Sequence, residues 1–113
     1  MKTIARLCAT ALVAATMMSG AVVAQEGSYL RKGKQTIVLT MRDGRLFCRR
    51  QADGFEMCNG MAPASDGTYR GKNMRHPAMK VMKFNGTVTF TDGGLNIRGC
   101  ALGICKAENW TKM

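Results

Sequence analysis

The residues with the most distinctive chemistry lie in one short stretch, MRHPAMKVM, at residues 74–82. Thioether and imidazole groups are donors that suit Cu(I). Further thioethers that the fold could bring nearby are those of Met57 and Met61. Methionines also fill irregular gaps in small cores, and a histidine before a proline commonly lies in an exposed turn. Core packing is the favoured interpretation and no cofactor is predicted, but a copper site remains an alternative. Its ligands would be Met74, His76, Met79 and Met82.

Cysteines supply the second feature with a chemical meaning. Four of the five lie beyond residue 25: Cys48, Cys58, Cys100 and Cys105. The spacings are C-x9-C and C-x4-C with a single histidine in the chain, and neither matches a zinc knuckle. An even number of cysteines in a short exported chain is typical of a disulfide framework. A small domain buries only a modest core, so such bridges are expected to contribute to its stability.

Catalytic groups are sparse in this sequence. The single histidine has no evident serine or cysteine partner, and cysteines held in disulfides offer no thiolate nucleophile. No glycine-rich phosphate loop follows a strand, and no pair of carboxylates stands out. The sequence therefore predicts a protein that is not an enzyme.

Basic residues dominate the charge of the chain. Beyond residue 24, fifteen Lys and Arg face seven Asp and Glu, which gives a net charge of +8. The clusters are Arg31-Lys32-Lys34, Arg49-Arg50 and the stretch 70–75. Such a charge favours anionic partners, and it also serves simply to keep a small domain soluble. The basic stretches lack interleaved aromatic residues, so nucleic acid is not an expected partner.

The first 24 residues have the pattern of a secretory signal. Lys2 and Arg6 precede an apolar stretch from Leu7 to Met18, and Val22-Val23-Ala24 offers small residues for cleavage. The apolar stretch is too short to span a bilayer, and no later segment does so. The compact, alanine-rich leader indicates a bacterial protein. We expect removal of residues 1–24 and a single domain over residues 25–113, located in the periplasm or secreted.

Short strands are predicted after residue 25. Turn signals recur roughly every ten residues, among them Asp43-Gly44, Asp66-Gly67 and Asp92-Gly93. Residues 35–41 and 86–91 alternate apolar and polar side chains, which is typical of strands with one buried face. The expected fold is all-β, a small antiparallel meander barrel or strongly curved sheet, with at most a helical turn or two within residues 72–82.

Hairpin geometry predicts the cysteine pairing. If residues 52–54 form a three-residue loop, positions whose numbers sum to 106 face each other, which places Cys48 opposite Cys58. Cys100 and Cys105 flank a four-residue loop in the same way. The second bridge would hold the last strand in the sheet, so that Trp110 covers the barrel or closes its end. Which face Trp110 takes stays open, because Lys106, Glu108 and Lys112 share its side of the strand.

The ending GGLNIRGCALGICKAENWTKM resembles the terminal signature of a family of small bacterial periplasmic proteins known as domain of unknown function 2147. That signature is a turn, a Leu-x-[IV]-[RK]-Gly strand, a short loop and a Trp-Thr-[RK] ending. The matching residues are Leu95, Ile97, Arg98, Gly99, Trp110, Thr111 and Lys112. The likeness is specific over about twenty residues, and the early Gly-x-Trp of the family is Gly27-Ser28-Tyr29 here. It implies a lipocalin-like barrel and carries no established activity.

Together these features predict an exported, basic binding or envelope-associated module. Its partners would be anionic envelope components, either lipid or lipopolysaccharide. The alternatives are the copper-binding role and a structural or stress-related accessory role without a small ligand. The oligomeric state is not predicted.

Overall fold

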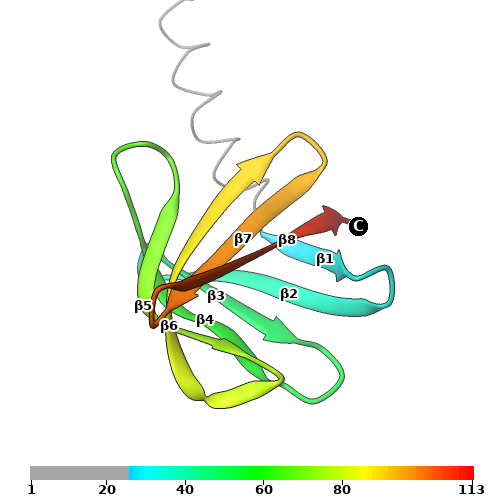
Figure 1. The fold of residues 1–113 in the computed structure, drawn as a ribbon. Helices are drawn as coiled ribbons and strands as arrows, with labels where there is room; N and C mark the ends of the chain where they lie inside the picture. Colours follow the sequence, from blue (N-terminus) through cyan, green and yellow to red (C-terminus); the bar gives the residue numbers. More distant parts are fainter. Residues whose placement is uncertain (1–25) are drawn as a thin grey trace, which may run out of the picture.

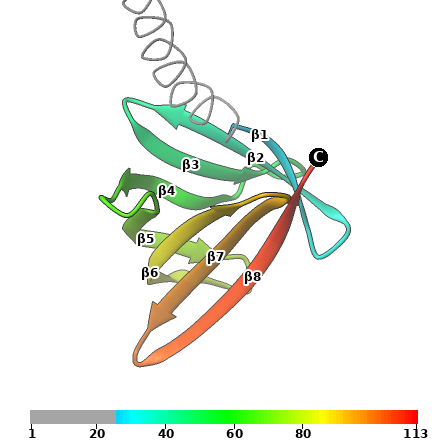
Figure 2. The ribbon, with the colours of Figure 1, turned by 90° about the horizontal axis from the view of Figure 1, so that it is seen from above.

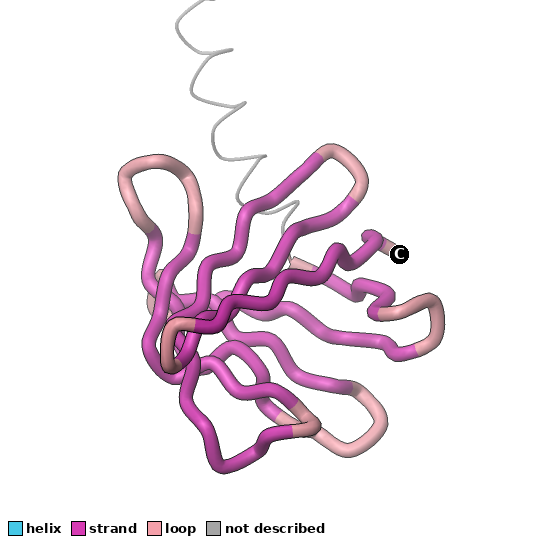
Figure 3. Tube along the Cα trace, in the orientation of Figure 1, coloured by secondary structure: helices cyan, strands magenta, loops and turns pink. Residues whose placement is uncertain are grey.

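A computed structural model describes residues 26–113, which form eight antiparallel strands in one closed barrel with neighbours in chain order (Figure 1). The strands are β1 (Gly27–Arg31), β2 (Gln35–Arg42), β3 (Arg45–Arg50), β4 (Glu56–Pro63), β5 (Tyr69–His76), β6 (Met79–Thr91), β7 (Gly94–Ala101) and β8 (Ile104–Lys112). Only strands and their connections occur within these residues (Figure 3). The predicted all-β meander is confirmed, and it is a closed barrel rather than an open curved sheet. The predicted signal segment lies outside the described residues.

Tight turns join most of the strands. In the β2–β3 turn, Asp43 and Gly44 have positive φ angles of 53° and 76°. Two-residue hairpin turns with positive φ at both positions match the right-handed twist of the flanking strands. The β7–β8 turn repeats this geometry with Leu102 and Gly103 at φ 54° and 77°. Ala101 pairs directly with Ile104, so the connection has two residues rather than the predicted four.

The barrel core follows the predicted alternation. Ile37 and Leu39 on β2 and Val88 on β6 are fully buried, while Met41 and Phe90 pack at its margin. The largest fully buried side chain is that of Trp110 on β8. β8 closes the barrel by pairing with β1 at three positions only, from Tyr29↔Lys112 to Arg31↔Trp110. The prediction that the last strand closes the sheet, held by the Cys100–Cys105 disulfide, is therefore confirmed, and Trp110 points inward.

Both predicted disulfides are present, Cys48–Cys58 between β3 and β4 and Cys100–Cys105 between β7 and β8. The three-residue loop used to derive the first pairing is wrong, because β3 ends at Arg50 and β4 begins at Glu56. Arg49 pairs with Glu56, and a β-bulge then restores the register at Cys58. The bulge compensates for the longer connection, so the cysteines still face each other.

One seam of the barrel is loosely paired. β4 and β5 share only the pairs Ala62↔Arg70 and Pro63↔Tyr69, whereas β7 and β8 pair along their whole length. Farther along the seam, the Asn59 Nδ2 atom donates to the Asn73 carbonyl oxygen at 2.7 Å. The two strands stay together here through a side chain rather than a ladder, and the barrel wall is interrupted. Figure 2 shows the barrel from above, with the β7–β8 hairpin reaching away from the β2–β3 turn.

Candidate functional site

A small pocket of about 50 Å³ lies inside the barrel, between the β5–β6 and β7–β8 hairpins. Its apolar wall consists of Met57, Met74, Met79, Phe84 and Ile97 together with Gly99, and its charged or polar rim consists of Arg75, His76, Lys106 and Glu108. An apolar floor with a few converging polar groups is the usual form of a small-molecule site. The volume suits the end of an aliphatic chain or a single ion, not a large ring system.

Two local features of the backbone place methionines in this pocket. Met57 is the extra residue of the β4 bulge, so both Met57 and Cys58 are buried although neighbours on a strand normally face opposite sides. Met74 extends over two glycines: a Cβ at Gly86 would lie 2.5 Å from its sulfur, and a Cβ at Gly99 would lie 2.3 Å from its methyl carbon. The absence of side chains at these two positions makes room for the thioether.

The predicted Met/His set is only partly brought together. Met74, His76 and Met79 line the pocket, whereas Met82 does not. Met61 is buried in the core beside Gly71 and Gly86. Residues 72–82 belong to the β5–β6 hairpin and contain no helical turn, which is within the predicted limit of at most a turn or two.

His76 is anchored on both sides of its ring. The Ala78 amide donates to His76 Nδ1 at 3.0 Å, which places the proton of the neutral ring on Nε2. Nε2 lies 3.8 Å from a Glu108 carboxylate oxygen and 3.4 Å from Arg31 Nη2. Burial, with the Arg31 charge, lowers the pKa of His76. The ring is therefore neutral at physiological pH, and neither nitrogen offers an uncommitted lone pair to a metal.

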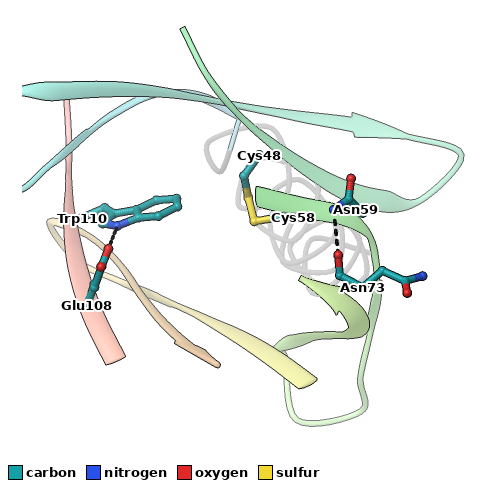
Figure 4. Close-up of a disulfide and its surroundings, with 6 residues drawn as sticks. All are labelled: Cys48, Cys58, Asn59, Asn73, Glu108 and Trp110. Atoms are coloured by element: carbon teal, nitrogen blue, oxygen red, sulfur yellow. Dashed lines mark hydrogen bonds between the residues drawn. A yellow bond between two sulfur atoms is a disulfide. The ribbon is translucent and has the colours of Figure 1, made fainter. Parts of the chain in front are cut away.

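A partly buried ion pair between Arg31 and the rim residue Glu108 was not foreseen from the sequence. The Arg31 guanidinium is 3% exposed and donates to both carboxylate oxygens of Glu108, at 2.7 and 2.8 Å. Gln35 accepts from the same guanidinium at 2.7 Å. The Trp110 indole N–H donates to Glu108 at 3.0 Å, and Figure 4 shows the indole pointing into the barrel on the side of the Cys48–Cys58 disulfide.

The ionised state of Glu108 is set by competing effects. Burial raises the pKa of this carboxyl, but the hydrogen bonds from Arg31 and Trp110 and the charge of Arg31 outweigh it and lower the pKa overall. Glu108 is therefore an ionised carboxylate, and the positive charge of Arg31 neutralises it. The remaining charge at the pocket rim comes from Arg75 and Lys106, so the mouth is basic.

The residues of the family signature have structural positions that explain several of their types. Leu95, Ile97 and Gly99 point inward from β7, whereas Arg98 is exposed. Thr111 and Lys112 are exposed on β8 beside buried Trp110. Ile97 and Gly99 line the pocket, so part of the signature contributes to its wall.

A second, polar hollow lies outside the loosely paired β4–β5 seam. It is lined by Phe55, Glu56, Asn59, Asn73, Arg75 and Lys83. One buried carboxylate oxygen of Glu56 has no hydrogen-bond partner, and burial raises the pKa of this group. Figure 4 shows the Asn59–Asn73 hydrogen bond that spans the seam.

A comparison of the chain with protein-family models, curated proteins and solved structures finds no match. The resemblance to the domain of unknown function therefore stays a prediction based on the terminal residues. Within residues 26–113, no three His, Cys, Asp or Glu side chains cluster so as to hold a metal ion. Across the same residues, no helix has the length and apolar character needed to cross a membrane. The two disulfides are compatible with an exported protein.

Proposed function

We propose that this chain is a basic binding module of the bacterial envelope, exported to the periplasm, that holds the apolar end of an anionic amphiphile. The observation that carries the proposal is the pocket between the β5–β6 and β7–β8 hairpins, with its methionine-rich wall and basic rim. The apolar tail of a ligand would contact Met57, Met74 and Met79. Its carboxylate or phosphate group would remain at the mouth beside Arg75 and Lys106. In this proposal the protein is not an enzyme, and it belongs to the domain-of-unknown-function family that its ending resembles.

The chemistry of the lining supports this ligand class. Methionine side chains are flexible and polarisable, so they adapt to aliphatic groups of varied shape. Because the Arg31 charge already matches that of Glu108, an incoming anion would meet the remaining cations of the rim. The limited volume means that only the last few carbons of a chain would enter.

Titration with decanoate tests the proposal, and decanol is the matched neutral probe. We expect saturable binding of one decanoate per chain, with NMR shifts at the methyl groups of Met57, Met74 and Met79 and weaker binding of decanol. Replacement of either Arg75 or Lys106 by Gln should weaken decanoate binding at least about fivefold, because each substitution removes one cation near the bound carboxylate. The matched variant Arg49→Gln lies outside the pocket and should bind decanoate as the parent does.

The proposal would be wrong if decanoate caused no saturable change, or if the shifts appeared away from the pocket. Equal binding of decanoate and decanol would refute the role of the basic rim. If decanoate caused no saturable change, the accessory role without a small ligand would be the better interpretation.

A second candidate is a Cu(I) site, because the pocket unites three thioethers from β4, β5 and β6. The proposed ligands are Met57, Met74 and Met79 rather than Met82, and His76 is committed to other partners. Thioethers select Cu(I) over harder ions. Titration with Cu(I) kept reduced by ascorbate should give one bound ion, lost in Met79→Leu and retained in Met82→Leu. Equal loss in both variants, or no bound Cu(I), would exclude this site.

A further inference from the structure

An outward protrusion of β6 is the first of two exposed apolar features beside the pocket. Between the pairs Met74↔Phe84 and His76↔Met79, β5 contributes only Arg75 whereas β6 contributes the four residues 80–83. The surplus residues form an irregular segment with Val81 at its centre, and Val81 is 91% exposed. The Arg75 guanidinium donates to the Lys80 carbonyl oxygen at 3.0 Å and holds this segment to β5.

The tip of the β7–β8 hairpin is the second such feature. Leu102 is 90% exposed and Ile104 is 65% exposed. Residues 104–107 are exposed on both faces, so the hairpin extends past the barrel wall. Leu102 also occupies a left-handed backbone position where Asn, Asp or Gly is favoured, as Asp43 is in the β2–β3 turn. A leucine at this position strains the backbone of the turn and exposes an apolar side chain to water. A residue that is unfavourable on both counts in the free protein indicates a role in binding.

Exposed lysines lie beside both apolar tips. Residues 67–107 contain seven Lys and Arg and a single acidic residue, Asp92, which lies in the β6–β7 turn. Lys80 and Lys83 flank Val81, and Lys106 follows Ile104 on β8; all three side chains are exposed. The two hairpins also flank the mouth of the pocket, to which Arg75 and Lys106 both contribute.

We propose that the β5–β6 and β7–β8 hairpins dock this protein onto an anionic lipid bilayer. Val81, Leu102 and Ile104 would enter the headgroup region, and the adjacent lysines would contact lipid phosphates. Exposed apolar side chains framed by lysines are the pattern of peripheral membrane attachment, since burial of apolar area and attraction to anionic lipid then add. Docking in this way turns the pocket mouth toward the bilayer. Val81, Leu102 and Ile104 lie outside the pocket lining, so their insertion into the headgroup region does not depend on what the pocket binds.

Cosedimentation of the exported chain with lipid vesicles tests the docking surface. Phosphatidylcholine vesicles with phosphatidylglycerol should bind the protein, and pure phosphatidylcholine vesicles should bind it weakly. Reversal of Lys80 and Lys83 to Glu should weaken binding by roughly fivefold or more per lysine. The control Arg42→Glu/Arg45→Glu carries the same net charge but changes the β2–β3 turn, which Figure 2 shows on the opposite side from the β7–β8 tip. This control should retain binding close to that of the parent.

The variant Leu102→Asn separates membrane binding from folding. Asn tolerates the left-handed conformation, so its thermal midpoint should equal or exceed that of the parent. Vesicle binding should nevertheless fall, because the apolar tip is lost. Val81→Ser and Ile104→Ser should act in the same direction.

Three results would overturn the inference. One is equal loss of binding in the two charge-reversal variants, which would indicate general charge attraction without a defined face. Another is full vesicle binding by Leu102→Asn. The third is no binding to anionic vesicles at low salt, which would leave the exposed tips as a contact for another protein. Decanoate binding by Leu102→Asn measures the pocket separately, so failure of one proposal is distinguishable from failure of the other.

Discussion

Removal of the Glu108 charge is expected to destabilise the barrel strongly, because Arg31 would remain buried without a counter-charge. Breaking a buried ion pair on one side costs about 3–5 kcal/mol. The Glu108 side chain is 24% exposed, and Gln retains one acceptor for Arg31, so we expect a loss of about 2–3 kcal/mol for Glu108→Gln. For a domain of this size each kcal/mol lowers the thermal midpoint by roughly 4–8 °C, so the expected decrease is on the order of 10–20 °C.

The matched variant removes both charges together. Arg31→Met/Glu108→Leu leaves no buried ion, and replacement of a buried pair by apolar residues is often close to neutral. We therefore expect the double variant to be more stable than Glu108→Gln. Urea denaturation of the parent, Arg31→Met, Glu108→Leu and the double variant measures the coupling between these residues.

The pH dependence gives a second measurement on the same pair. The folded-state pKa of Glu108 is lowered, so its contribution is present above the unfolded pKa of about 4.3 and is lost as the pH falls through the folded value. The difference between parent and Glu108→Gln should therefore shrink in acid. A Glu108→Gln protein as stable as the parent at pH 7, or strictly additive single variants, would refute this reasoning.

Three further predictions concern other parts of the barrel. The pKa of His76 is lowered in the folded state, so its contribution to the free energy of unfolding is complete above the unfolded pKa of about 6.5 and decreases as the pH falls toward the folded pKa. His76→Gln should lose this pH dependence in denaturation curves. An unchanged pH profile in that variant would contradict the prediction. The β7–β8 disulfide is partly exposed, whereas the β3–β4 disulfide is buried. Mild reduction followed by alkylation and peptide mapping should therefore label the β7–β8 cysteines first. Earlier labelling of the β3–β4 cysteines would contradict this difference in solvent exposure. Gly94→Ala should unfold the barrel or lower its thermal midpoint sharply, because a Cβ there would lie 1.9 Å from the Trp110 carbonyl oxygen; a midpoint equal to that of the parent would argue against this close approach.

The sequence by itself determined the local features of this protein. Turn residues such as Asp43-Gly44 set tight hairpins, and alternation along residues 86–91 decided which side chains are buried. Both disulfides follow from the same short-range logic, since each joins neighbouring strands across one connection. These features depend on contacts between residues close in the chain, so local patterns carry most of the information. The Cys48–Cys58 pairing also needed the β4 bulge, which offsets a β3–β4 connection longer than predicted.

The tertiary structure decided what lies inside the barrel. A bulge of one residue in β4 turned Met57 inward, and the surplus residues of β6 turned Val81 outward; neither irregularity has a turn signal in the sequence. Arg31 and Glu108 meet across 77 residues of chain because β8 returns to pair with β1. That closure also gave Trp110 its buried face, which the polar residues alternating with it on β8 left open. Register shifts and barrel closure depend on the sum of many distant contacts, so no local pattern specifies them.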